Sequence, residues 1–212
     1  MRTERLHFLG AGVLLLGAAG LAWHGQPTPA EKWQFLAPVL QPRLTNREVY
    51  IEPAELVQLM HDDYIQLLLI DVRDERDWNL FHLWGAERIA PERLRTHRKR
   101  FATLAHNAVV VFVGNDEALA SAAWKEVMVT ASRPNAYILS GGLNRWLEQY
   151  AGHGRARRHA RPAVDGNLRH APRWALGARH PAALPDPHQT PRQDFPRKVR
   201  LQKRVVRKGG CG

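Results

Sequence analysis

The sequence predicts an α/β fold with a central, mainly parallel sheet and helices on both faces. Three short apolar runs indicate this fold class, because each has the length of a buried strand and helical stretches separate them. The apolar runs are residues 67–71, 109–113 and 136–139. The helical stretches are residues 92–104, 116–130 and 143–150. Ahead of them we expect a short strand at 48–51 and a helix that begins at Pro53.

The N-terminal segment, residues 1–23, has the features of a membrane anchor. Arg2 and Arg5 precede residues 6–23, an apolar stretch of 18 residues in which His7 is the only polar side chain. This length suits a membrane-spanning helix better than the core of a signal peptide, although a cleaved signal stays as the alternative. The positive-inside rule predicts a single-pass protein with a cytoplasmic N-terminus, and in a bacterium the rest of the chain is periplasmic.

Residues 24–45 connect this anchor to the domain. Four prolines occur in this stretch, at positions 27, 29, 38 and 42, so the sequence predicts an extended linker rather than a continuous helix. The linker is unusually apolar, since it contains Trp33 and Phe35. We therefore expect it to pack against the domain, the membrane surface or a partner.

Two sequence motifs stand within residues 46–151. Asp71, Arg73, His82 and Gly85 stand in an Asp-Val-Arg segment followed by Phe-His-Leu-Trp-Gly-Ala, which is similar to the first rhodanese signature. A Gly-Gly-Leu-Asn-Arg-Trp segment at 141–146 is similar to the C-terminal signature. The resemblance covers about half the chain and implies the rhodanese fold, a parallel sheet covered on both sides.

Each of these signature residues also has a structural interpretation. Asp71 ends a buried strand, and Arg73 can pair with a nearby carboxylate. Gly141 and Gly142 suit a tight turn from strand to helix, and Trp146 would face the core one turn later. We interpret His82 as a residue that stabilises a turn rather than as a catalyst. The signature therefore predicts a fold without predicting an activity.

The nucleophile of active rhodaneses has no counterpart here. The resemblance implies that a cysteine would directly follow the central strand, and it places Val113 at that position, followed by a loop of Gly114, Asn115, Asp116 and Glu117. A valine cannot carry a sulfane sulfur. Asp116 and Glu117 would also repel an anionic substrate, and we interpret Asp116 as the N-cap of the next helix. The sequence thus predicts a catalytically silent domain.

The tail, residues 152–212, accounts for all of the net positive charge of the protein. It holds 15 Lys and Arg against 3 Asp and Glu, whereas residues 1–151 hold 16 against 17, and the total is +11. Seven of the 14 prolines lie here, so we expect disorder or a strap laid over another surface. Residues 198–206 alternate basic and apolar side chains, which would allow a strand on the sheet edge of a partner.

Three classes of function follow, and the first is the one we favour. It is a membrane-tethered binding or scaffold subunit of a membrane or periplasmic complex, with protein partners. The second is a sulfur carrier that uses Cys211, the only cysteine, which also excludes an intrachain disulfide and a cysteine metal cluster. The third is a polyanion binder acting through the tail, with anionic lipid more accessible than nucleic acid. No cofactor is implied, and the 11 histidines lack metal-site spacing.

Overall fold

The computed structural model describes residues 27–131, 135–151, 166–170, 172, 174–188 and 194–201. The predicted anchor at 1–23 and Cys211 lie outside these residues. So do residues 152–165 and 202–212 of the tail. Among the helices of the described ranges, none combines the length and the apolar character needed to cross a membrane.

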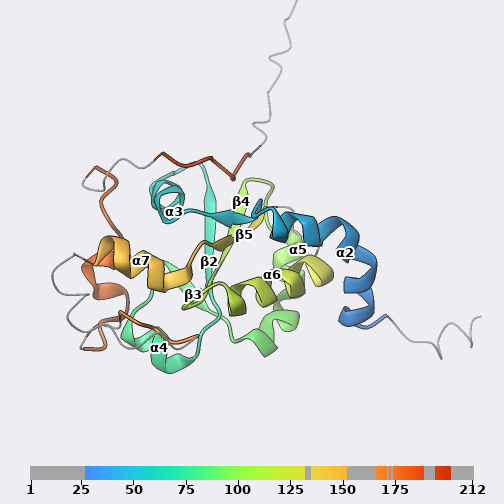
Figure 1. Cartoon of the computed structure of the whole chain (residues 1–212), viewed down its shortest axis with the longest axis horizontal. Coiled ribbons are helices and arrows are strands. Elements are labelled where there is room, and N and C mark those ends of the chain that lie inside the picture. The colour runs from blue at the N-terminus through green and yellow to red at the C-terminus, as the bar shows by residue number, and fades with distance from the viewer. Residues whose placement is uncertain are drawn as a thin grey trace, which may run out of the picture.

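A five-stranded parallel sheet forms the centre of the molecule (Figure 1), with the strand order β1-β5-β4-β2-β3. The strands are β1 (Tyr50–Ile51), β2 (Gln66–Asp71), β3 (Ala86–Arg88), β4 (Ala108–Val113) and β5 (Ala136–Leu139). All six side chains of β4 and all four of β5 are buried. Burial on both faces explains why these strands are continuously apolar rather than alternating. The expected α/β class and parallel sheet are confirmed.

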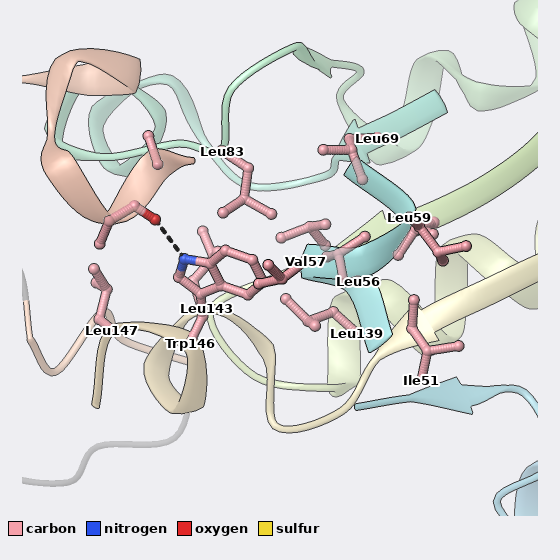
Figure 2. Packing of buried hydrophobic residues seen from close by; sticks show 14 of the residues in the cluster. Ile51, Leu56, Val57, Leu59, Leu69, Leu83, Leu139, Leu143, Trp146 and Leu147 are labelled. Carbon is pink, nitrogen blue, oxygen red and sulfur yellow. Dashed lines mark hydrogen bonds between the residues drawn. The ribbon is translucent and has the colours of Figure 1, made fainter. Parts of the chain in front are cut away.

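Helices cover both faces of the sheet. They are α2 (Pro29–Thr45), α3 (Pro53–Met60), α4 (Glu75–Leu80), α5 (Arg98–Thr103), α6 (Ala118–Ala131) and α7 (Gly142–Tyr150), with 3₁₀ turns η1 (Pro91–His97), η3 (Gly177–Arg179) and η4 (Pro181–Ala183). One apolar core, which contains Leu56, Leu143 and Trp146, includes side chains of α3 and α7 (Figure 2). The other, which contains Leu40 and Trp124, includes side chains of α2, α5 and α6.

Helix α2 corrects the expectation of an extended linker at 24–45. Thr28 caps the helix, because its hydroxyl accepts a hydrogen bond from the backbone N–H of Glu31 and its own N–H donates to the Glu31 carboxylate. Pro29 occupies the first turn, where no N–H is needed. Pro38 and Pro42 lie inside the helix, four residues apart and both exposed. Their missing hydrogen bonds therefore fall on the water-facing side, where solvent can reach the carbonyls left without a donor.

Two further helical expectations need adjustment. The stretch at 92–104 is not one helix, since it divides into the 3₁₀ turn η1 and the short helix α5. The helix expected from residue 116 begins at Ala118. Strand β3, at Ala86–Arg88, had no counterpart among the predicted strands because it is only three residues long and half-buried.

The tail segment 194–201 lies against α3. Glu55 is buried, and its Oε1 accepts hydrogen bonds of 2.9 Å from the backbone N–H groups of both Lys198 and Val199. Burial raises the pKa of Glu55, and these two hydrogen bonds offset part of that shift. Residues 198–201 form no strand here, and the rest of the predicted 198–206 strand lies outside the described residues.

Helix α2 should behave as part of the domain in unfolding experiments. Leu40 is buried in the core, whereas Val39 beside it is 67% exposed. We expect Leu40→Ala to lower the free energy of unfolding by about 2–4 kcal/mol. Val39→Ala, the matched control, should change it by less than about 0.5 kcal/mol. Urea unfolding of the full chain in mild detergent measures both, and equal effects would mean that α2 is a linker and not part of the core.

Candidate functional site

The candidate site lies at the carboxyl end of the sheet, where β2, β4 and β5 end in Asp71, Val113 and Leu139. The strands are parallel, so the residues that follow them are brought together at one edge. Ser140 and Gly141 follow β5, and residues 114–117 follow β4. The two sequence segments that resemble the family signature therefore meet here, although about 70 residues separate them along the chain.

A buried ion pair joins Asp71 and Arg73. The guanidinium Nε and Nη2 donate to the two carboxylate oxygens of Asp71 at 2.9 and 2.6 Å, and both side chains are 1% exposed. Nη2 also donates to the backbone carbonyl of Phe81, and Nη1 donates to the Asn115 side-chain oxygen at 3.1 Å. Arg73 thus connects the end of β2 with the turn after α4 and with the loop after β4. The expected pairing of Arg73 with a carboxylate is observed.

Asn115 is the buried centre of the loop. Its side-chain oxygen accepts from Arg73, while its Nδ2 donates to the carboxylate of Asp77 and, at 2.8 Å, to the backbone carbonyl of Gly166. Gly166 belongs to the tail, 51 residues later in the sequence. One amide side chain therefore uses both its donor and its acceptor groups to connect the loop with α4 and the tail.

Asp116 uses its carboxylate for two backbone N–H groups. Oδ1 accepts from Ala118 at 2.9 Å, and Oδ2 accepts from Gly166 at 2.8 Å. The carbonyl of Glu117 accepts the first hydrogen bond of α6, from Ser121. The N-cap position is therefore Glu117, one residue later than predicted, and Asp116 makes an i to i+2 turn just before it. The predicted N-cap at Asp116 is therefore wrong by one residue, although the Asp116 carboxylate does accept the N–H of the first residue of α6.

Glu117 joins the loop to the β5–α7 turn and to the residues before β1. Its Oε1 accepts from the backbone N–H of Gly141 at 2.7 Å, and both carboxylate oxygens accept from Arg47 at 2.7 and 3.0 Å. Burial by itself would raise the pKa of Glu117, but the hydrogen bonds from Arg47 and Gly141 outweigh it and lower the pKa. Arg47 has a positive φ of 56°, a conformation that these contacts help to hold.

Gly142 shows why a glycine is required in the second signature. It has a φ of +58°, and a Cβ at this position would lie 2.7 Å from the backbone of Gly114 and Asn115. The backbone N–H groups of Leu143 and Asn144 donate to the carbonyls of the same two loop residues. The start of α7 therefore packs directly on the loop, in agreement with the tight turn expected here.

A strap from the tail covers this loop. We use the name C-terminal strap for the described residues between 166 and 188. Asn144 on α7 binds the strap from both of its side-chain groups: Nδ2 donates to the carbonyl of Asn167 at 2.8 Å, and Oδ1 accepts from the N–H of Arg169 at 2.7 Å. Leu168 between them is buried in the core. The described part of the tail is therefore a strap on the chain's own domain, the second of the two forms that the composition allowed.

The strap continues across the domain to Trp146. The indole N–H of Trp146 donates to the carbonyl of Ala182 at 2.7 Å, the dashed line in Figure 2, and Ala182 is itself buried. Two backbone hydrogen bonds also join the strap to the domain. The backbone N–H of Trp84 donates to the carbonyl of Ala183, and the backbone N–H of Leu176 donates to the carbonyl of Leu80. Trp146 lies in the core, as expected. Its polar atom is satisfied by the strap rather than by the domain.

His82 lies in the turn after α4, and its contacts agree with a structural role. Its ring stacks on Trp78 with centroids 3.6 Å apart, and its Nδ1 is 2.9 Å from the Trp78 carbonyl. Gly177 of the strap packs on the ring, because a Cβ there would approach His82 Cε1 to 2.8 Å. Gly85 follows with a φ of +71°, which favours glycine in this turn.

Val113 offers no group for covalent chemistry. It is the last residue of β4, and its side chain is buried. That it stands at the cysteine position of active rhodaneses stays a prediction. Within the described part of the chain, no group of three His, Cys, Asp or Glu side chains could hold a metal ion. The polar side chains at this edge form hydrogen bonds with backbone and side-chain groups of the chain itself.

Several residues of the site were not predicted. Arg47, Asp77 and Asn144 supply side-chain partners to the loop or the strap. Asp77 and Asn144 stand inside the two signature segments, but no role was predicted for them, and nothing in the sequence marks Arg47. Gly166 and Leu168 lie in a polar, proline-containing tail without hydrophobic periodicity. The single indication was that the tail contains isolated apolar residues, which is weak evidence for packing.

The parallel sheet and the two signature segments define a class of small α/β domains. Residues 52–149 match the family described as the rhodanese-like domain, and this part of the chain is a rhodanese-like domain. Helix α2, strand β1 and the strap lie outside the match. No curated protein matches the chain.

Similar solved structures include a full-length protein from Lactobacillus plantarum, with 21% identity and a TM-score of 0.41 over 50% of this chain and 88% of that one. Another is a protein from Bacillus halodurans, with 15% identity and a TM-score of 0.39 over 52% of this chain and 80% of that one.

Removal of the Asn115 side chain should loosen the strap. In Asn115→Ala the loop loses its bonds to Asp77 and Gly166, and one N–H of buried Arg73 loses its acceptor. We expect a loss of about 1–3 kcal/mol of stability and faster amide hydrogen exchange at residues 166–170. Asn107→Ala is the matched control, because that amide donates one exposed hydrogen bond, to Tyr64. Unchanged exchange at 166–170 in Asn115→Ala would contradict the role of this loop in holding the strap.

His180 should make the strap sensitive to acid. Burial lowers the pKa of His180, and its Nδ1 must be unprotonated to accept the N–H of Ala182 at 3.1 Å. An unfolded histidine has a pKa of about 6.5, so as the pH falls the unfolded chain takes up the proton first. This contribution to stability is complete above about pH 6.5 and is lost as the pH falls toward the lower pKa of the folded state.

The measurement is the thermal midpoint at pH 7.5 and pH 5.5. His180→Asn keeps an acceptor oxygen but cannot be protonated, so we expect a smaller drop between the two pH values than in the unaltered protein. His188→Asn, at an exposed position, should leave the drop unchanged. An equal drop in His180→Asn and the unaltered protein would show that another group is responsible.

Proposed function

We propose that this protein is a non-catalytic rhodanese-like module, tethered to a membrane by residues 1–23, that serves as a binding or scaffold subunit of a membrane or periplasmic complex. The observation that carries the proposal is the commitment of the loop to internal contacts. The side chains of Asn115 and Asp116 form hydrogen bonds with Gly166 of the strap, and that of Glu117 forms hydrogen bonds with Arg47.

Sulfur transfer has requirements that this loop does not meet. It needs a thiolate, lowered in pKa by N–H donors and a helix N-terminus, and an open approach for an anionic donor. Here the last residue of the central strand β4 is Val113, which has an alkyl side chain, and the carboxylates of Asp116 and Glu117 lie just before α6. A rhodanese fold in this form keeps its shape and has its surface available for partners.

The strap side of the domain offers a surface that fits a protein partner. Trp84 is 59% exposed and Leu184 is 41% exposed, and the hydrogen bond between the Trp84 N–H and the Ala183 carbonyl brings their chain segments together. Tryptophan is enriched at the centre of protein interfaces because it buries a large area at low cost in conformational entropy. We expect a partner to contact this surface.

Co-isolation tests the proposal. The protein, purified from native membranes in mild detergent, should arrive with other proteins in a fixed ratio, as measured by mass spectrometry and particle size. Trp84→Asp should remove these partners with the thermal midpoint preserved. Tyr64→Asp, a control at a side chain that is 90% exposed near the opposite edge of the sheet, should retain them. Recovery of the unaltered protein as a lone monomer would contradict the scaffold role.

An activity assay tests the proposed absence of catalysis. We expect no transfer of sulfur from thiosulfate to cyanide above the uncatalysed background, both for the full chain and for Cys211→Ser. Turnover by the full chain that is lost in Cys211→Ser would replace the proposal with a sulfur carrier.

A further inference from the structure

Helix α2 has two apolar faces, and only one of them is used by the domain. Leu40 and Leu44 are buried in the core, with Trp33 and Leu36 packed against it. Phe35, Pro38, Val39 and Pro42 are all exposed, and their spacing of i, i+3, i+4 and i+7 places them on one stripe along the outer side. Phe35 is 81% exposed and Val39 is 67% exposed. We call these four residues the α2 stripe.

The borders of the stripe suit a lipid headgroup region. Lys32 lies on the same side of the helix as Val39. Arg43 and Lys125 lie between the helix and the domain, where Arg43 stands over the ring of Trp124 at 5.9 Å and Lys125 of α6 stands over the ring of Trp33 at 5.0 Å. The carboxylate of Glu31, in the first turn and four residues before Phe35, lies on the side of the stripe and is bound by Thr28. Apolar side chains flanked by basic ones are typical of helices that lie in the interface of an anionic membrane.

Pro38 and Pro42 limit how deeply the α2 stripe can insert into a lipid bilayer. Since Pro38 and Pro42 have no N–H, the carbonyls of Gln34 and Pro38 lack their helical donor. Such carbonyls are costly in hydrocarbon, but they can be hydrated at headgroup level. A shallow groove of about 780 Å³ runs along the helix at Gln34 and Pro38, so water has access to them. The stripe is therefore suited to the interface and not to the bilayer core.

The chain before α2 fixes where the stripe can be. Only five residues separate Trp23, the end of the apolar stretch, from Pro29 at the start of α2. Even when fully extended, this connection spans no more than about 20 Å. If residues 6–23 cross a bilayer, α2 has to lie at its surface.

We infer that the α2 stripe docks in the headgroup region of the membrane that residues 6–23 cross, and this inference rests on the proposed tether. The occupant is the lipid surface itself. Figure 1 shows α2 at one end of the molecule and α4 and α7 at the other. Docking through α2 therefore turns the strap side away from the membrane, toward partners in the aqueous space.

Fluorescence quenching tests the docking. The full chain with Cys211→Ser and one added cysteine, Val39→Cys or, as a second reporter, Phe35→Cys, is labelled with an environment-sensitive dye. It is reconstituted into vesicles of phosphatidylethanolamine and phosphatidylglycerol. Tyr64→Cys, at the exposed turn between α3 and β2, is the matched water-facing control. We expect a quencher on the lipid acyl chains to act at least twofold more strongly on the α2 labels than on the control, and iodide to act less strongly.

Each other result overturns the inference in a distinguishable way. Labels on α2 that behave like the control, in a protein that still resists carbonate extraction from the vesicles, would refute the docking and leave the tether in place. Extraction by carbonate would refute the tether and the docking together. Labels shielded from both quenchers would show that protein, such as a second copy of the chain, covers the stripe.

Discussion

The buried pair of Asp71 and Arg73 is the interaction on which the rest of the site depends. Two charges that are almost completely removed from water are tolerated only when every polar atom has a partner. Asp71 supplies two acceptor oxygens, and the carbonyl of Phe81 and the side chain of Asn115 supply the others. Because Asn115 must present its oxygen to Arg73, its N–H₂ group is directed at Asp77 and the strap. The position of the strap thus follows from the needs of a guanidinium in the core.

The chemistry of the loop is inverted relative to an anion-binding loop. A phosphate or persulfide site presents backbone N–H groups to a negative ligand. Here Asp116 and Glu117 bring two carboxylates to the start of α6, where the helix dipole favours them, and these accept the N–H groups of Gly166 and Gly141. The helix N-terminus still stabilises negative charge. That charge belongs to the protein.

Much of the fold could be predicted from the sequence, and the reasons are local. The runs at 109–113 and 136–139 are apolar throughout because both faces of β4 and β5 are covered, and the two glycines after β5 mark a turn that only glycine fits. Helix α2 could not be predicted, since four prolines indicate an extended chain. The Thr-x-x-Glu capping box at 28–31 and the i, i+4 spacing of Pro38 and Pro42 stand in the sequence, but only the structure shows that both prolines lie on the water-facing side.

The candidate site was also predicted only in part, and the reason differs from that for helix α2. Asp71 and Arg73 lie within the first signature segment, and the resemblance also places the acidic loop, but several of their partners come from distant parts of the chain. The contact between Asn115 and Gly166 spans 51 residues, and that between Trp146 and Ala182 spans 36. Each partner contributes a backbone group, which every residue type possesses, so sequence cannot mark it. Backbone recognition of this kind leaves no compositional trace.

The absence of a catalytic thiol that we propose would be physically coupled to the presence of the strap. A loop that carries a sulfane sulfur must be accessible to the molecules that donate and accept the sulfur. A strap hydrogen-bonded to the side chains of that loop would block this access. In the non-catalytic module that we propose, with Val113 at the end of β4, no such opening is needed, and the loop side chains hold the tail. Leu168 and Ala182 then add buried apolar surface to the core that contains Trp146. In this arrangement, the edge of the sheet that would bind a substrate in an open domain instead binds the chain's own tail, and the strap presents a new outer surface in its place.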